Sequence, residues 1–288
     1  MNVLSLFDGM SCGQVALSRA EIEVDNYYAS EMDKYAIKVT QANWPKTIQL
    51  GDVTNWREWR IDWASIDLLI GGSPCQGFSF AGKQLAFDDP RSALFFEYLN
   101  ILNHIKKVNP AVKFLLENVN MKKEYLDVIS GLLGVEPVFI NSSLVSAQNR
   151  QRYYWCNWEF QGPHDRSITW GDIKEENAPS IHYYSDRGLD WIKRHSERTG
   201  KKLRVWAKDE KCQMLEATMY KNYSGQRFFA VEDIHGKRYI SLLECERAQT
   251  VPDNYTNHVS NTQRYKMLGN GWTVDVIAHI FRGMNENN

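Results

Sequence analysis

The sequence predicts an α/β fold, with a doubly wound, mostly parallel sheet and a smaller inserted domain. Over the first 141 residues, short apolar runs that suit buried strands alternate with helical periods. Such alternation is typical of a parallel sheet with helices on both faces. Beyond Tyr154 the pattern changes, and aromatic and charged residues become frequent. A chain of 288 residues is long enough for one large core domain and a smaller one.

Each expected strand is a short apolar or aromatic run that stops at or just before a glycine, an asparagine or an acidic residue. The expected strands are 2–7, 24–30, 47–50, 67–70, 112–116 and 135–141. The expected helices between them are 12–20, 32–43, 92–107 and 122–133. The second helix stops before Pro45, and the third has apolar residues at helical spacing from Leu94 to Ile105.

The inserted domain is expected from the composition of the chain between Trp155 and Lys237. This part contains many Trp, Tyr and charged residues and short β-like pieces such as 227–231. Residues 273–282 return to an apolar helical period, which predicts a C-terminal helix that packs on the first domain. We therefore expect a first domain of 1–154 with 262–288, and a second domain with its return segment at 155–261.

The charges are uneven along the chain, although the formal net charge is only −1. Residues 187–211 contain nine basic and four acidic residues, with Trp191 and Trp206 among them. This excess suits a surface that contacts phosphates, and it equally suits an ordinary solvated face.

The five cysteines are few and widely spaced, at positions 12, 75, 156, 212 and 245. Their odd number argues against a disulfide framework, and the absence of a Cys-x-x-Cys pair argues against a structural zinc site. We expect all except Cys75 to be small buried side chains. No apolar run is long enough for a membrane span or has the form of a signal peptide, which predicts a cytoplasmic protein.

Cys75 is singled out by its position in Gly71-Gly72-Ser73-Pro74-Cys75-Gln76, directly after an expected buried strand. Open α/β sheets bind ligands beyond the carboxyl ends of their strands. Glu117-Asn118-Val119 follows a second apolar run and places a carboxylic acid at another strand end. A nucleophile and an acid so placed suggest covalent catalysis on a polarisable ring. Alternatively, Glu117 and Asn118 cap a helix.

Glycine and acidic residues at the first three strand ends suggest a cofactor. The first strand leads into Phe7-Asp8-Gly9-Met10-Ser11-Cys12-Gly13, where glycine lets a ligand approach the backbone. The spacing of its glycines disfavours a dinucleotide, and a plain tight turn also explains this segment. Glu31 and Asp52 follow the next two strands, where they can accept from ribose hydroxyls and an exocyclic amine. Together these residues favour a cofactor that contains adenosine.

These motifs resemble those of the DNA cytosine-5 methyltransferases, in the order in which that family has them. The matching blocks are 4–13, 71–83, 117–119, 148–152, 244–247 and 269–271, and the variable segment is about 158–236. Residues 5–9 and 271–274 are similar to the catalytic domain of the mammalian de novo enzymes. The short chain is more similar to bacterial or phage enzymes. Asp8 stands where alanine is commoner in the family.

The resemblance implies a Rossmann-like fold that binds S-adenosylmethionine as the methyl donor, and double-stranded DNA as the partner. The implied cofactor residues are Phe7, Gly9, Glu31, Met32, Asp52, Val53, Pro74, Leu94, Asn270 and Trp272. The implied catalytic residues are Cys75, which attacks cytosine C6, Glu117, which acts at N3, Arg152, which holds the flipped base, and Arg150, which supports the site.

The resemblance also implies that the variable segment is the target-recognition domain. The expected DNA contacts are Gln76, Ser79 and Arg91 around a loop that closes over DNA, Gln148 beside the site, and Lys201, Lys202, Arg204 and Arg227 in the variable segment. We expect a monomer, with a cognate restriction endonuclease as a further partner. The sequence does not give the DNA target.

Two other functions remain open. One is a tRNA cytosine methyltransferase on the same scaffold, although the Cys-Phe-Thr element usual in the eukaryotic tRNA enzymes is absent from this sequence. The other is a catalytically silent DNA-binding homologue, which the presence of both Cys75 and Glu117 argues against. The run Gln148-Asn149-Arg150-Gln151-Arg152 could also be a solvated strand edge.

Overall fold

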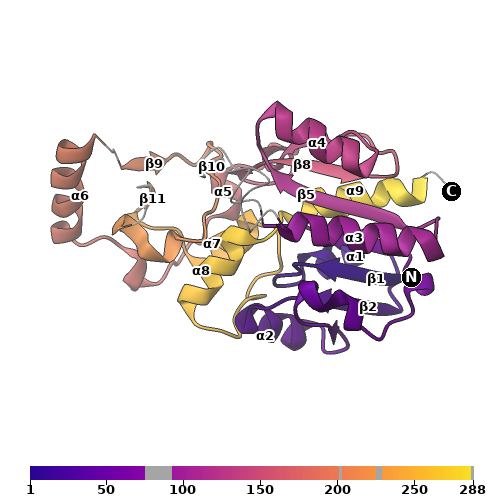
Figure 1. Cartoon of the computed structure of the whole chain (residues 1–288). Helices are drawn as coiled ribbons and strands as arrows, with labels where there is room; N and C mark the ends of the chain where they lie inside the picture. Colours follow the sequence, from indigo (N-terminus) through magenta and orange to yellow (C-terminus); the bar gives the residue numbers. More distant parts are fainter. Residues whose placement is uncertain (75–92, 201–202, 225–228, 287–288) are drawn as a thin grey trace. The chain divides into compact units, whose positions relative to one another are not determined.

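The computed structural model describes residues 1–74, 93–200, 203–224 and 229–286. Contacts between Cα atoms divide the chain into two compact units (Figure 1). The first unit is 1–141, 151–163 and 274–288, and the second is 142–150 and 164–273. No helix of the described residues has the length and apolar character needed to cross a membrane.

The first unit is built on a seven-stranded sheet with the order β3-β2-β1-β4-β5-β8-β6. Its strands are β1 (Asn2–Leu6), β2 (Asn26–Ser30), β3 (Ile48–Gln49), β4 (Leu68–Gly71), β5 (Lys113–Val119), β6 (Val138–Asn141) and β8 (Gln151–Cys156). The neighbours from β3 to β5 are parallel, whereas β8 is antiparallel to both β5 and β6. The predicted mostly parallel α/β sheet is confirmed. The strand order reverses between β1 and β4, the kind of place where such sheets bind ligands.

Helices cover this sheet as the sequence predicts. They are α1 (Cys12–Arg19), α2 (Lys34–Asn43), α3 (Ala93–Val108), α4 (Lys123–Leu133) and α9 (Val274–Glu286), with short 3-10 helices η1 (Val53–Glu58) and η2 (Trp63–Ser65). Phe95, Tyr98 and Leu102 of α3 are fully buried, which confirms its predicted apolar face. The C-terminal helix α9 packs on α1, and Arg19 pairs with Asp275 at 2.7 Å.

One strand is longer than the sequence predicts, and this changes the position of the candidate acid. Strand β5 continues through Val119, so Glu117 and Asn118 lie within the strand rather than after it. The pairing with β8 runs from Leu115 opposite Cys156 to Val119 opposite Arg152 and extends β5 beyond its apolar run. The helix-cap interpretation of Glu117 and Asn118 is wrong, because α4 begins only after Lys122.

The second unit has two small sheets and several helices. Strands β7 (Gln148–Asn149) and β10 (Cys212–Gln213) pair in one sheet, and β9 (Arg204–Trp206), β11 (Phe229–Asp233) and β12 (Gly236–Arg238) form the other. Its helices are α5 (Trp170–Ile173), α6 (Asp186–Thr199), α7 (Leu242–Ala248) and α8 (Asn261–Asn270), with 3-10 helices η4 (Ser142–Leu144), η5 (Ser180–His182) and η6 (Met219–Ser224). The sequence indicates β11 but does not predict α6, which buries only Ile192.

A buried ion cluster stabilises the second unit. The Arg238 side chain is fully buried, and its guanidinium donates to Asp233 at 2.9 Å and to both Glu244 oxygens at 2.9 and 2.7 Å. Burial opposes the ionisation of Asp233, but hydrogen bonds from Tyr183 and Arg238 outweigh it and lower the pKa of this carboxyl to about 2. All three charges are therefore compensated inside the unit.

Replacement of Arg238 with methionine is expected to destabilise the second unit by about 3–5 kcal/mol, because it leaves two buried carboxylates without their cation. Urea denaturation followed by tryptophan fluorescence measures the change. Lys237→Met is the matched control, since the neighbouring Lys237 makes only an exposed pair with Glu232 at 3.9 Å, and such pairs contribute about 0–1 kcal/mol. Equal destabilisation by the two variants would contradict the importance of the buried cluster.

Candidate active site

Glu117 and Arg152 form a close ion pair at the carboxyl end of β5. Glu117 lies opposite Tyr154, and Arg152 lies opposite Val119, so the two side chains are diagonal neighbours on one face of the antiparallel pair. Arg152 Nε is 2.7 Å from Glu117 Oε1, and each residue is 8% exposed. The pairing of β5 with β8 thus joins a carboxyl and a guanidinium that are 35 positions apart in the chain.

The segment that leads to Cys75 is bonded to the strand that carries Glu117. The Asn118 amide donates to Ser73 Oγ at 3.4 Å, and both residues are buried. Gly71 fits closely in this segment, since an added Cβ would lie 3.1 Å from the carbonyl oxygen of Leu6 and from the Tyr98 ring. Pro74 follows Ser73 and is half-buried. Cys75, the next residue, lies outside the described residues, so its expected role stays a prediction.

Glu31 organises the loops after β1 and β2. One oxygen of its carboxylate accepts the Gly9 amide at 2.8 Å. The other accepts the amides of Met32 and Asp33, each at 2.7 Å. Three backbone donors therefore fix this carboxylate beside Gly9, and a carboxylate still has acceptor capacity beyond three hydrogen bonds for a ligand hydroxyl.

The loop after β1 has an unusual backbone. Phe7, Gly9 and Ser11 all adopt the left-handed conformation, with φ of 58°, 59° and 59°. This region favours glycine, and the two other residues must be held there by their surroundings. The Asp8 carboxylate lies between them, accepting from the Ser11 hydroxyl and from the Tyr27 hydroxyl, the latter at 2.7 Å.

A buried polar network continues behind this loop. Ser11 Oγ accepts from Thr40 Oγ1 at 3.2 Å and from the Gln14 amide at 3.2 Å, and Gln14 also donates to Thr47 at 2.8 Å. The pKa of Asp8 is raised to about 6. Burial is the main cause and the negative charge of Glu31 adds to it, while hydrogen bonds from Ser11, Ser5 and Tyr27 act in the opposite direction. The sequence shows Asp8 only as a departure from the commoner alanine, and its hydrogen bonds identify it as the residue that holds the loop.

Asp8 is expected to make the stability of the protein depend on pH between about 4 and 6. Its folded pKa of about 6 exceeds the ordinary value of 3.8, so the folded chain binds an additional proton in this window. The free energy of unfolding should therefore fall as the pH rises, by up to about 3 kcal/mol. Asp8→Asn should lack this contribution, and urea titrations of both proteins between pH 4 and pH 7.5 measure the difference. Parallel stability profiles would contradict the raised pKa.

The other expected cofactor residues of the first unit lie at the same edge of the sheet. Asp52 begins η1, with its side chain accepting the Thr54 amide at 2.9 Å, and Val53 beside it is buried. Met32 is 68% exposed and offers apolar surface after β2. Leu94, in the first turn of α3, is half-buried. Carboxylates for ribose hydroxyls, apolar surface for a base and an open glycine backbone fit an adenosine cofactor.

Arg150 lies in the second unit, and its guanidinium is directed at backbone carbonyls. It donates to Leu215 at 3.3 Å, to Gly269 at 3.3 and 3.4 Å and to Gly271 at 2.9 Å, and it is 3% exposed. These bonds hold the Gly269-Asn270-Gly271 segment, so Arg150 positions this segment. Asn270 itself is exposed and Trp272 is half-buried, and both belong to this unit.

Gln148 is also held within the second unit. Its amide donates to Ala248 O at 2.7 Å and to Gln249 at 2.9 Å, and its carbonyl accepts the Leu215 amide at 3.1 Å. It has no exposed surface. In this structure the Gln148 side chain supports its own unit, and its expected contact with DNA stays a prediction. The solvated-edge interpretation is wrong, because Gln148, Arg150 and Arg152 are all buried.

The expected DNA contacts are mostly outside the described residues. Those outside are Gln76, Ser79, Arg91, Lys201, Lys202 and Arg227. The Arg204 side chain is half-exposed, and its guanidinium nitrogen Nη2 lies 3.9 Å from Glu210 Oε1. The basic stretch 187–211 is not one surface: Trp206 is buried against Trp170, and the Lys211 ammonium donates to Ser143 O at 2.7 Å. Among the described residues of the stretch, exposed basic side chains remain on α6 and at Arg204 and Lys208.

The four described cysteines are buried, as predicted. Burial raises the pKa of Cys156 to about 11 and holds that of Cys245 well above its ordinary value. Such thiols are poor nucleophiles at neutral pH. None of the four competes with Cys75 as a candidate nucleophile.

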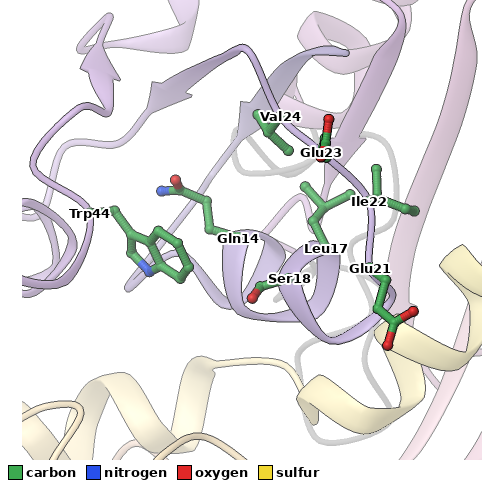
Figure 2. A pocket seen from close by; sticks show the side chains of 8 residues that line it. All are labelled: Gln14, Leu17, Ser18, Glu21, Ile22, Glu23, Val24 and Trp44. Carbon is green, nitrogen blue, oxygen red and sulfur yellow. The ribbon is translucent and has the colours of Figure 1, made fainter.

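A pocket of about 430 Å³ lies beside α1 (Figure 2). It is lined by Gln14, Leu17, Ser18, Glu21, Ile22, Glu23, Val24 and Trp44, none of which is an expected site residue. We assign it no role in the reaction.

Comparison with known proteins identifies the family. The family model of the C-5 cytosine-specific DNA methylases matches residues 1–128 and 138–286. The chain belongs to this family. It is therefore a DNA (cytosine-5-)-methyltransferase by family, which confirms the resemblance based on the order of the motifs.

Bacterial relatives span nearly the whole chain. The type II methyltransferase M1.ScrFI of Lactococcus lactis subsp. cremoris is 31% identical over 312 residues, covering 99% of this chain and 78% of that protein. M.NlaX of Neisseria lactamica, also a type II methyltransferase, is 30% identical and covers 98% and 95%. The solved structure of the Entamoeba histolytica methyltransferase EhMeth has a TM-score of 0.78 at 16% identity, covering 100% and 98%, and shows the same fold.

Proposed function

We propose that this methylase transfers a methyl group from S-adenosylmethionine to C5 of cytosine in one specific sequence of double-stranded DNA. The observation that carries the proposal is the buried Glu117–Arg152 pair, whose Glu117 lies on β5, the strand bonded through Asn118 to the segment that leads to Cys75. The pair supplies an acid and a cation at the carboxyl end of β5. Strand β5 is the neighbour of β4, which precedes the nucleophile. The base must leave the duplex to reach this pair, at a cost of a few kcal/mol.

The proposed reaction begins with attack of the Cys75 thiolate on cytosine C6. The new S–C6 bond moves electrons toward N3, where Glu117 donates a proton, and C5 becomes nucleophilic. C5 takes the methyl group and then loses its proton to a base. Elimination then breaks the S–C6 bond and returns the thiolate, Glu117 takes back the N3 proton, and neutral 5-methylcytosine is released. Arg152, paired with Glu117 at 2.7 Å, orients the acid and offers donors to the base.

S-adenosylmethionine supplies the methyl group on a sulfonium centre. We propose that Phe7, Gly9, Glu31, Met32, Asp52, Val53, Pro74 and Leu94 hold it, together with Asn270 and Trp272. Glu31 and Asp52 would accept from its hydroxyl and amine groups, and their negative charges suit a positively charged ligand. Asp8 acts on the cofactor only through the loop from Phe7 to Ser11.

Further proposals concern the surroundings of the enzyme. We propose that the segment 155–261 reads the DNA target. We also propose that the enzyme acts as a monomer in the cytoplasm and that a cognate restriction endonuclease is its partner. The type II methyltransferases among its relatives support the last proposal.

Bisulfite sequencing tests the activity and identifies the target. A plasmid from a methylation-free host that expresses the enzyme should contain protected cytosines in one short motif. The same plasmid with Cys75→Ser should be fully converted. Conversion in both would overturn the proposal for duplex DNA, and methyl transfer to tRNA would then be measured. Protection that persists with Cys75→Ser would overturn the role of Cys75.

Covalent trapping separates chemistry from silent binding. A duplex with 5-fluorocytosine at the target position lacks the C5 proton, so the adduct cannot eliminate. The wild-type enzyme should form a species with DNA that survives denaturing electrophoresis, and Cys75→Ser should not. Absence of the species with wild-type enzyme would contradict the covalent mechanism.

A further inference from the structure

Helix α6 (Asp186–Thr199) of the second unit carries a stripe of Arg187, Trp191, Arg194 and Arg198, called here the arginine stripe. The spacing of 4, 3 and 4 residues places these side chains within about 60° of one another around the helix. All four are exposed, whereas Ile192 on another side of the helix is buried. Figure 1 shows α6 at the edge of this unit, beyond β9 and β11.

Local contacts hold the stripe in place. The Trp191 ring, 37% exposed, stacks on His195 with ring centroids 4.8 Å apart and an interplanar angle of 19°. The Arg198 guanidinium is 3.2 Å from His195 Nδ1. The helix is capped at both ends, by the Ser185 side chain and by Gly200 in the left-handed conformation. The stripe is therefore on a defined helix.

The acidic residues of α6 are separate from the stripe. The helix has four basic and three acidic residues, but Asp186, Asp190 and Glu197 share a neighbouring sector around the axis. The stripe itself has no carboxylate. A helix with little net charge thus presents one strongly basic face.

We propose that the arginine stripe binds the phosphate backbone of the duplex that flanks the target cytosine. This rests on the proposed function, since it takes duplex DNA as the substrate. Arginine matches phosphate with paired hydrogen bonds, and tryptophan adds a flat contact for sugar or base edges. The stripe is about 16 Å long, and each DNA strand presents a phosphate every 3.4 Å of axis, so several can be reached.

A membrane surface is the less suitable partner. Helices that lie on membranes need an exposed apolar face for the acyl region. In α6 the apolar side is taken up by the unit, since Ile192 is buried and Leu189 is half-buried. DNA requires only the basic face.

The salt dependence of DNA binding tests the proposal. Binding of a 30-base-pair duplex is measured by fluorescence anisotropy at several salt concentrations, for the wild type and for the triple variant Arg187→Gln, Arg194→Gln and Arg198→Gln. Each lost phosphate contact lowers the slope of log K against log salt by about 0.9, so a reduction of 2 to 3 is expected. Affinity should fall by the same factor for duplexes with and without the target motif.

A matched pair of single variants is Arg194→Gln and Lys193→Gln. Each removes one positive charge from α6, but Arg194 belongs to the stripe and Lys193 lies on a different side of the helix. Only Arg194→Gln should lower the slope. An unchanged slope in the folded triple variant, checked by circular dichroism, would overturn the proposal, as would equal effects of the two single variants. Loss of binding to anionic vesicles with an unchanged DNA slope would also overturn it in favour of a membrane.

The salt-dependence test of the arginine stripe gives a result that is independent of the catalytic proposal. If the wild type protects cytosines and the slope does not change, the stripe proposal alone fails. If the slope falls as expected but the wild type protects no cytosine, the stripe binds DNA and the proposed function fails.

Discussion

Replacement of Glu117 with glutamine is expected to lower kcat for methyl transfer by about 100- to 10,000-fold. Glutamine has nearly the shape of glutamate and can accept from Arg152, which lies 2.7 Å away, but its amide cannot supply the proton at N3. The loss should therefore appear in the chemical step. Single-turnover transfer of a labelled methyl group to a saturating duplex measures it.

The control for this prediction is Glu124→Gln. Glu124 is in the first turn of α4 and its side chain is 64% exposed, so removal of its charge should leave the rate within twofold of the wild type. A Glu117→Gln rate within threefold of the wild type would exclude Glu117 as the acid. Binding of the duplex by Glu117→Gln, measured in parallel, shows whether the site still forms.

Substitution of Gly269 with alanine is expected to destabilise the second unit by more than about 4 kcal/mol. An added Cβ would lie 2.2 Å from the carbonyl carbon of Glu216 and 2.3 Å from the nitrogen of Ala217. Both are backbone atoms, so no side-chain rotation relieves the overlap. The segment before η6 would have to move away from α8, and the carbonyls of Leu215 and Gly269 that Arg150 holds together would separate.

Gly131→Ala is the matched control for this prediction. Gly131 lies within α4, and an added Cβ there meets no atom within 4 Å. Alanine should stabilise that helix by about 0.5–1 kcal/mol. Urea denaturation of both variants gives the two values. A Gly269→Ala protein within 1 kcal/mol of the wild type would contradict the close backbone packing.

Local patterns of apolar and polar residues in the sequence predicted several strands and helices of the first unit. Strand β1 and helix α3 follow directly from apolar periods that end at glycine or polar residues. The sequence missed α6, although its polar and apolar residues follow a helical period, because the helix is highly charged and buries only Ile192. It also ended β5 too early, because hydrogen bonds to β8 prolong that strand past its apolar residues.

Part of the candidate site could likewise be predicted. The strand-end positions of Glu31 and Asp52 follow from the alternation of strands and helices, and both carboxylates lie where that alternation indicates. The burial of Gln148 could not be predicted, since glutamine is usually exposed and its partners come from distant segments. Asp8 was equally hidden, because its role depends on Tyr27 and on a loop conformation that no local pattern encodes.

The sequence by itself determined the family, the α/β architecture and the residue types available for chemistry, because these are fixed by motif order and by local periodicity. Only the tertiary structure decided which of these residues meet. Glu117 and Arg152 are brought together by the antiparallel pairing of β5 with β8. The Arg150 guanidinium donates to the backbone carbonyls of Leu215, Gly269 and Gly271. Such contacts depend on strand register and on the burial of charge, and these are properties of the packed chain rather than of any segment.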